Sequence, residues 1–196
     1  MNQPLLEIPP DRLPKGHTQE SFHHHELGHA VVGITEGFKT NGIVSHNHFG
    51  LLKWYPNASG GVWWRDEPYV VSDPDGVKYS PEERLANSRK WATANLAGAA
   101  ANELIDGITF KDNRGADTDL SRVRGLFEGH HGMTEATAGI EIAKAYQRAK
   151  EHLSRPGVLD AIREAARTRE NGLDERFHYS EDRLSRISGA TNERNT

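Results

Sequence analysis

The sequence contains no cysteine among its 196 residues. Disulfide bonds and thiolate metal ligands are therefore excluded, and any metal site must use His, Asp or Glu side chains. The chain has no apolar run of about 18 residues, so no membrane-spanning helix is expected. It also has no G-x-x-x-x-G-K-[ST] phosphate-binding loop, so no ATPase module is expected.

The chain has no excess of basic residues, because its net charge is −4. This gives no reason to expect a nucleic-acid partner. Hydrophobic residues make up 35% of the chain and charged residues 27%, as in soluble globular proteins. The N-terminal stretch MNQPLLEIPPDRLPKGH lacks the pattern of a secretory signal. We therefore expect a cytoplasmic protein with an extended arm at 1–17, one domain at 18–190 and a frayed tail at 191–196.

The helix and strand signals predict a mainly helical α+β fold. A first helix is expected from Thr18 to Glu36, with Thr18 as N-cap and a glycine after its end. Residues 38–79 contain GIVSH, GLLKWY, GVWWR and YVVS, which predict a small antiparallel sheet inserted after that helix. The capping box SPEE predicts a long helix from Ser80 to near Asp106. Further helices are expected at 117–128, at 135–153, at 158–169 and after Ser180.

The most informative segment is SFHHHELGHAVVG, which contains the pattern H-E-x-x-H. On a helix, His25 and His29 lie on one face, where both imidazoles can reach one Zn²⁺ ion at about 2.0–2.1 Å. Glu26 lies beside them and could act as the general base toward a zinc-activated water. The alternative is a polar helix face that is merely rich in histidine. The helix cap and the flanking apolar residues favour the zinc site.

A catalytic zinc site needs a third protein ligand and one open position. Candidates lie in two downstream segments, LAGAAANELIDG and RGADTDLSRVRGL. Six further histidines are not expected to be ligands, and the first two are expected to be solvated: His23, His24, His46, His48, His130 and His131.

Taken together, these segments resemble the peptidase domain of the FtsH family of ATP-dependent zinc proteases (peptidase family M41). HELGHAVVG is similar to H-E-A-G-H-A, and AGAAANELIDG is similar to G-G-R-A-A-E-E-L followed by glycine. RGADTDL is similar to T-G-A-S-N-D-L, and HGMT to Y-G-M-S. The motifs occur in the family's order from about Phe22 to Met133, with a weaker resemblance to about Ile187. The resemblance implies a helical zincin-like M41 fold.

The resemblance also implies two more site residues. Asp119 stands at the family's third zinc ligand, the aspartate of N-D-L. Glu103 stands at a glutamate that would accept a hydrogen bond from a zinc-binding histidine, and helical spacing also places it on an apolar face. Asp117 is expected to be an N-cap. Ala99 and Asn102 replace the family's arginine and first glutamate, and we expect these changes to affect packing or subunit contacts more than zinc.

The expected function is that of a zinc-dependent endopeptidase acting on flexible or unfolded polypeptides, with Glu26 as the base. A strand edge in HFGLLKWY or GGVWWR could hold an extended substrate. Three alternatives stay open: a non-catalytic zinc-binding scaffold or regulatory protein that retains the fold, a zinc-dependent regulator that cleaves or binds a single partner protein, and a zinc hydrolase acting on a non-peptide amide. The sequence also leaves open a homo-oligomer or an external ATPase partner.

Overall fold

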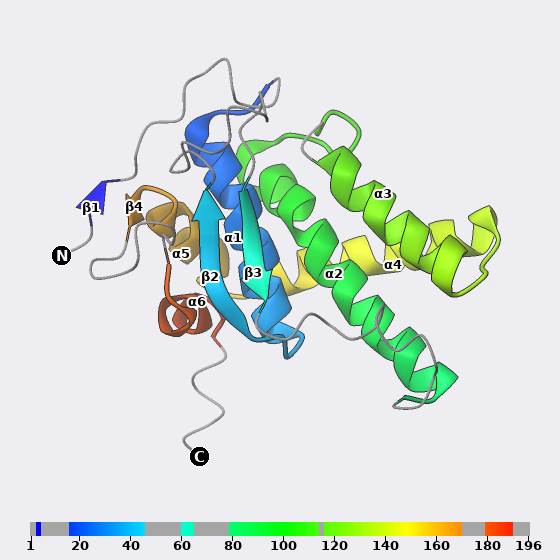
Figure 1. Ribbon diagram of the computed structural model, residues 1–196. Helices are drawn as coiled ribbons and strands as arrows, with labels where there is room; N and C mark the ends of the chain where they lie inside the picture. The colour runs from blue at the N-terminus through cyan, green and yellow to red at the C-terminus, as the bar shows by residue number, and fades with distance from the viewer. Residues whose placement is uncertain are drawn as a thin grey trace, which may run out of the picture.

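The computed structural model describes residues 3–4, 16–45, 60–64, 79–113, 116–169 and 179–189. Within this part, six α-helices make up most of the structure (Figure 1). They are α1 (Gln19–Thr35), α2 (Pro81–Asp106), α3 (Asp117–Gly125), α4 (Glu135–Leu153), α5 (Val158–Ala165) and α6 (Glu181–Ser188). α3 continues into a π-helical turn, η5 (Leu126–His130). The prediction of a mainly helical fold is confirmed.

α1 is buried along its length, from Ser21 to Ile34. At its start, the Thr18 hydroxyl accepts a hydrogen bond from the Ser21 amide at 3.0 Å, and the Ser21 hydroxyl accepts one from the Thr18 amide at 2.8 Å. These reciprocal bonds satisfy two amide groups that the helix itself cannot. After the helix, Gly37 adopts a φ of +96°, which glycine tolerates without strain. The predicted first helix is confirmed.

α2 begins and ends at the predicted signals. The Ser80 amide donates to Glu83 Oε2 at 2.8 Å, and the Glu83 amide donates to Ser80 Oγ at 3.2 Å. Pro81 occupies the first helical turn, where its missing N–H has no intrahelical role. Gly107 follows the last turn with a φ of +71°. The capping box and the terminal glycine therefore set both helix ends, as predicted.

α1 and α2 cross at close range. A Cβ atom on Gly28 of α1 would lie 2.6 Å from the Ala97 carbonyl oxygen and 2.8 Å from Ala101 Cβ, both on α2. Only glycine fits this contact, which supplies the packing reason for a glycine inside a helix. The main core surrounds the crossing and includes Leu27, Val31, Ala97, Leu153, Ile162 and Leu184. A second core cluster, with Leu96 and Phe127, joins α2, α3, η5 and α4.

A two-stranded antiparallel pair lies beside α1 (Figure 1). It consists of β2 (Thr40–Ser45) and β3 (Gly60–Trp64), with Ile43 opposite Val62. Val62 packs against the main core. Both strands fall within the segment 38–79, where the sequence favours strands. The candidate substrate edge HFGLLKWY in the same segment lies outside the described residues.

Two local predictions need correction. The helix expected at 158–169 ends at Ala165, because Thr168–Arg169 form β4, which pairs antiparallel with β1 (Gln3–Pro4). The N-cap of α3 is Ala116 rather than Asp117, which is the first residue of the helix, and no side chain caps that terminus.

The tail at 191–196 and most of the arm at 1–17 lie outside the described residues. In the ranges that the structure describes, every helix is too short or too polar to cross a bilayer.

Candidate metal centre

The three residues predicted to bind zinc meet in one buried cluster. His25 and His29 lie one turn apart on α1, and Asp119 lies in the first turn of α3. The two Nε2 atoms are 3.0 Å apart, and Asp119 Oδ2 lies 3.2 Å from that of His25 and 3.3 Å from that of His29. Because each residue offers one ligand atom to a common centre, this group could hold a metal ion.

Hydrogen bonds on the opposite ring nitrogens orient both imidazoles. His29 Nδ1 lies 2.8 Å from the Ala94 carbonyl oxygen, and His25 Nδ1 lies 3.0 Å from Asn102 Oδ1. His29 Nδ1 also has the Gly98 amide at 3.3 Å, but the carbonyl oxygen is nearer. Each Nδ1 is therefore assigned the hydrogen toward its oxygen partner, and each Nε2 of a neutral ring presents a lone pair. Two imidazole lone pairs and a carboxylate oxygen therefore face one point, which is a suitable donor set for Zn²⁺.

The electrostatics of the metal-free cluster fit a cation at that point. Burial acts to lower the pKa of His29, but the Asp119 carboxylate outweighs burial and raises this pKa to about 9. Burial acts to raise the pKa of Asp119, but the imidazoles of His29 and His25 outweigh it and hold this pKa well below its ordinary value. The carboxylate thus favours a positive charge beside it, such as a proton on His29. A divalent ion would take the place of that proton.

The backbone of α2 forms one wall of the cluster at Gly98. A Cβ atom at this position would lie 2.5 Å from His29 Nε2 and 2.7 Å from His25 Nε2. The absence of a side chain therefore leaves the space in which the two imidazoles converge. Gly98 is not among the predicted site residues, although the small-residue run LAGAAA around it indicates a close helix contact.

Glu26 follows His25 on α1 and is 5% exposed. Burial raises the pKa of this carboxyl group, while the charges of His25 and His29 act in the opposite direction. A carboxylate with a raised pKa is better matched to taking up and releasing a proton near neutral pH. The role of Glu26 as a base stays a prediction.

The predicted position of Glu103 in the site needs correction. Its carboxylate accepts hydrogen bonds from the Tyr146 hydroxyl and the Lys150 ammonium group, both at 2.6 Å, on the side of α2 that faces α4. Asn102 contacts His25 instead. One residue along a helix corresponds to a rotation of about 100°. Asn102, which we expected to affect packing or subunit contacts, therefore contacts one of the three residues that could hold a metal ion.

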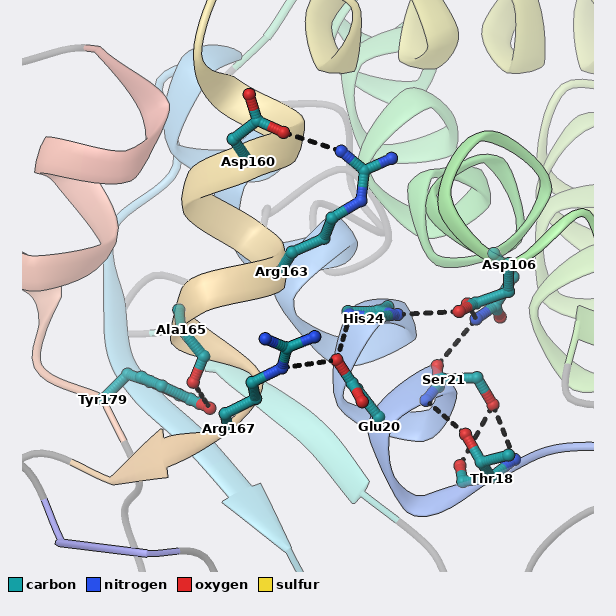
Figure 2. Close-up of polar contacts among 11 residues, drawn as sticks. Thr18, Glu20, Ser21, His24, Asp106, Asp160, Arg163, Ala165, Arg167 and Tyr179 are labelled. Atoms are coloured by element: carbon teal, nitrogen blue, oxygen red, sulfur yellow. Dashed lines mark hydrogen bonds and ion pairs between the residues drawn. The ribbon is translucent and has the colours of Figure 1, made fainter.

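The prediction that His23 and His24 are solvated is also wrong, because they are only 2% and 3% exposed. His24 Nδ1 donates to Asp106 Oδ1 at 2.9 Å, a pairing across 82 positions of the chain (Figure 2). His131 lies away from the cluster, with its Nε2 2.7 Å from the Ser88 hydroxyl, and His130 is exposed. The remaining two, His46 and His48, lie outside the described residues.

Comparisons with known proteins assign no family to this chain. No protein-family model matches it, and no curated protein matches it significantly.

Proposed function

We propose that this protein is a zinc-dependent endopeptidase that hydrolyses peptide bonds in flexible or unfolded polypeptides. The observation that carries the proposal is the convergence of His25 Nε2, His29 Nε2 and Asp119 Oδ2 within 3.3 Å. A buried glutamate follows the first of these ligands. Two histidines, one carboxylate and an adjacent glutamate are the donor set and the base of a zinc hydrolase.

The order of the motifs supports a fold like that of the M41 peptidases. HELGH lies on α1, AGAAANEL lies on α2, and the DTDL part of RGADTDL opens α3. In this chain the second motif packs its small residues against the first, and the third supplies the carboxylate.

The residues of the site have distinct roles in the proposed reaction. A zinc ion bound there supplies Lewis acidity toward a carbonyl group and lowers the pKa of water to about 7. Glu26 takes up the proton of the attacking water and passes it to the leaving amine. The Ala94 carbonyl and the Asn102 amide hold the two imidazoles in the orientation that binds the metal.

The position of the strand pair supports an extended polypeptide as substrate. β2 and β3 lie beside α1, which carries two of the three ligands (Figure 1). A peptide in extended conformation can bind a strand edge through its backbone, and flexible segments reach this conformation without unfolding a core.

A zinc-binding scaffold without catalysis is the second candidate. The observation that favours it is the burial of the ligands, since the side chains of His25, His29 and Asp119 are 8%, 11% and 12% exposed. Structural zinc sites are closed, whereas catalytic sites keep one position open. The buried Glu26 favours catalysis, because a structural site needs no base.

The test compares the purified chain with Glu26→Gln and Asp119→Ala. Bound zinc is measured by mass spectrometry after dialysis, and cleavage is measured with fluorescence-quenched casein. We expect Glu26→Gln to keep its zinc and to lose about 10²–10⁴-fold in cleavage rate, because only the proton transfer is removed. Asp119→Ala should lose most of its zinc.

Glu82→Gln is the matched control, because Glu82 is an exposed glutamate in the first turn of α2. It should retain both zinc and cleavage. Zinc binding without cleavage of any substrate by the wild-type chain would favour the scaffold. Full zinc retention in Asp119→Ala would contradict the ligand set.

A further inference from the structure

We infer that Asn102 is a positioning residue of the metal centre. Its side-chain amide orients the His25 ring and ties this ring to the segment that leads to Asp119. The inference rests on the proposed function, because it concerns the same metal ligands. Asn102 thereby takes the role that the motif resemblance implies for Glu103.

The amide of Asn102 uses its full hydrogen-bonding capacity. Its Nδ2 donates to the Ser21 carbonyl oxygen at 2.6 Å and to Asp106 Oδ2 at 2.9 Å. Its Oδ1 accepts from His25 Nδ1 and from Asn113 Nδ2, both at 3.0 Å. An amide has two N–H donors and one oxygen with two lone pairs, so all four positions are filled. Asn102 is fully buried, and the four bonds compensate for this burial.

These bonds determine which way the amide points. The Ser21 carbonyl and the Asp106 carboxylate can only accept, so the NH₂ group must face them and the oxygen must face His25. His25 Nδ1 must then donate, which leaves Nε2 free to bind a cation. A rotated amide would place N–H against N–H at His25 and oxygen against oxygen at Ser21.

Asn102 also connects the segments that carry the ligands. Ser21 and His25 belong to α1, and Asn102 itself belongs to α2. Asn113 is 1% exposed and lies six residues before Asp119 in the sequence. One buried amide therefore joins the ligand helix α1 to the approach to α3.

Asp106, which accepts a hydrogen bond from the Asn102 amide, also accepts one from His24 on α1. Figure 2 shows the His24 ring between the carboxylates of Glu20 and Asp106. The Arg167 guanidinium in turn donates to Glu20. A carboxylate that accepts from both His24 and Asn102 has a defined position, so the amide it orients has one too.

Three variants test the inference through zinc affinity, measured by competition with a chromophoric chelator, and through the visible absorption of the Co²⁺-loaded chain. We expect Asn102→Ala to bind zinc about 10–100-fold more weakly and to change the cobalt spectrum, because His25 loses its acceptor. Asn102→Asp keeps an acceptor for His25 but cannot donate to Ser21 or Asp106. Glu103→Gln, the neighbouring control, should keep wild-type affinity and spectrum.

The two Asn102 variants separate positioning from general stability. A purely structural role makes Asn102→Asp at least as harmful as Asn102→Ala in every measurement, because a carboxylate beside Asp106 is repelled. Positioning instead gives Asn102→Asp the tighter zinc binding of the two, whatever its unfolding temperature.

Wild-type affinity and an unchanged cobalt spectrum in Asn102→Ala would overturn the inference while leaving the proposed function intact. Failure of the wild-type chain to bind either metal would overturn both. If Asn102→Ala does not fold, Asn113→Ala decides, because it removes one of the bonds that orient the amide. A shifted cobalt spectrum in that variant supports positioning, and an unchanged one rejects it.

Discussion

At the scale of single residues, the candidate centre depends on one position without a side chain. Gly98 allows the α2 backbone to lie against the Nε2 atoms of His25 and His29. The ligand atoms meet within 3.0–3.3 Å because nothing projects between them from this wall. The glycine is therefore as necessary for the geometry as the donors themselves.

Gly98→Ala should weaken zinc binding at least about tenfold. The added Cβ would lie 2.5–2.7 Å from ring atoms of both histidines, which is closer than a real Cβ contact, so the imidazoles or the helix must move. Substitutions of residues that orient a metal ligand typically weaken metal binding by about 10–100-fold. Chelator competition measures the effect.

Gly139→Ala on α4 is the matched control. A Cβ at Gly139 meets nothing within 4 Å, and alanine is favoured over glycine in a helix by about 1 kcal/mol. This variant should keep its zinc affinity and unfold at a slightly higher temperature. Equal affinity of both variants and wild type would contradict the role assigned to Gly98.

The sequence predicted which residues meet in the cluster better than it predicted the residues that orient them. His25, Glu26 and His29 follow from helical spacing, and Asp119 follows from a motif resemblance. The choice between Asn102 and Glu103 could not be made from periodicity, because α2 is buried on nearly every side from Ala92 to Asn102. A helix buried all round has no polar face to mark which residue points at a neighbour.

At the scale of elements, α1 is attached to α4 through a charged contact at its C-terminal end. The Glu36 side chain is 1% exposed and accepts from Arg148 at 2.6 and 2.8 Å. It also lies 2.7 Å from His152 Nε2. Burial acts to raise the pKa of Glu36, but the hydrogen bonds from His152 and Arg148 outweigh burial and lower it.

Glu36→Gln should lower the free energy of unfolding by about 1–3 kcal/mol at pH 7, because charge-assisted hydrogen bonds to a buried carboxylate are lost. Because folding lowers the pKa of Glu36, the ionised carboxylate stabilises the folded state. This contribution is complete above the pKa of an ordinary glutamate, about 4.3. It disappears as the pH falls through the folded-state pKa. The difference between wild type and variant should therefore shrink below about pH 4, as measured by urea unfolding.

The exposed Glu164 on α5 provides the control, because Glu164→Gln should have little effect at either pH. A stability difference for Glu36→Gln that stays constant from pH 7 to pH 3 would contradict this account of the α1–α4 contact.

Element ends could be predicted where a local signal exists. Ser80 with Glu83 and the glycine after Asp106 define α2 through contacts a few residues apart. The helix expected to reach Arg169 fails because its last residues pair with Gln3–Pro4, at the other end of the chain. Such long-range pairing leaves no mark in a short window of sequence.

At the scale of the whole molecule, the cluster joins segments that are far apart in the chain. α1 and α3 supply the three candidate ligands, and α2 lies between them in sequence and contacts both (Figure 1). A cation that contacts all three residues binds the folded chain more tightly than the unfolded one, because only folding brings them together. Binding and folding stability are therefore linked.

Saturating zinc should raise the unfolding temperature of the wild-type chain. Free zinc at about 100 times its dissociation constant adds about 2.7 kcal/mol, which corresponds to about 5–10 °C for a chain of this length. Differential scanning fluorimetry with zinc or with EDTA measures the shift. Asp119→Ala should show almost none, and an equal shift in that variant would place the bound zinc elsewhere.

The two glycines at the crossing of α1 and α2 have a consequence for metal selectivity. Gly28 faces α2 and Gly98 faces the histidines of α1, and a Cβ added at either position would overlap atoms of the other helix. The close approach of the two helices thus depends on glycine at both positions, whichever ion binds. A preference for another divalent cation would therefore require a different donor atom, for example through a substitution at Asp119, and no change in the packing of the two helices.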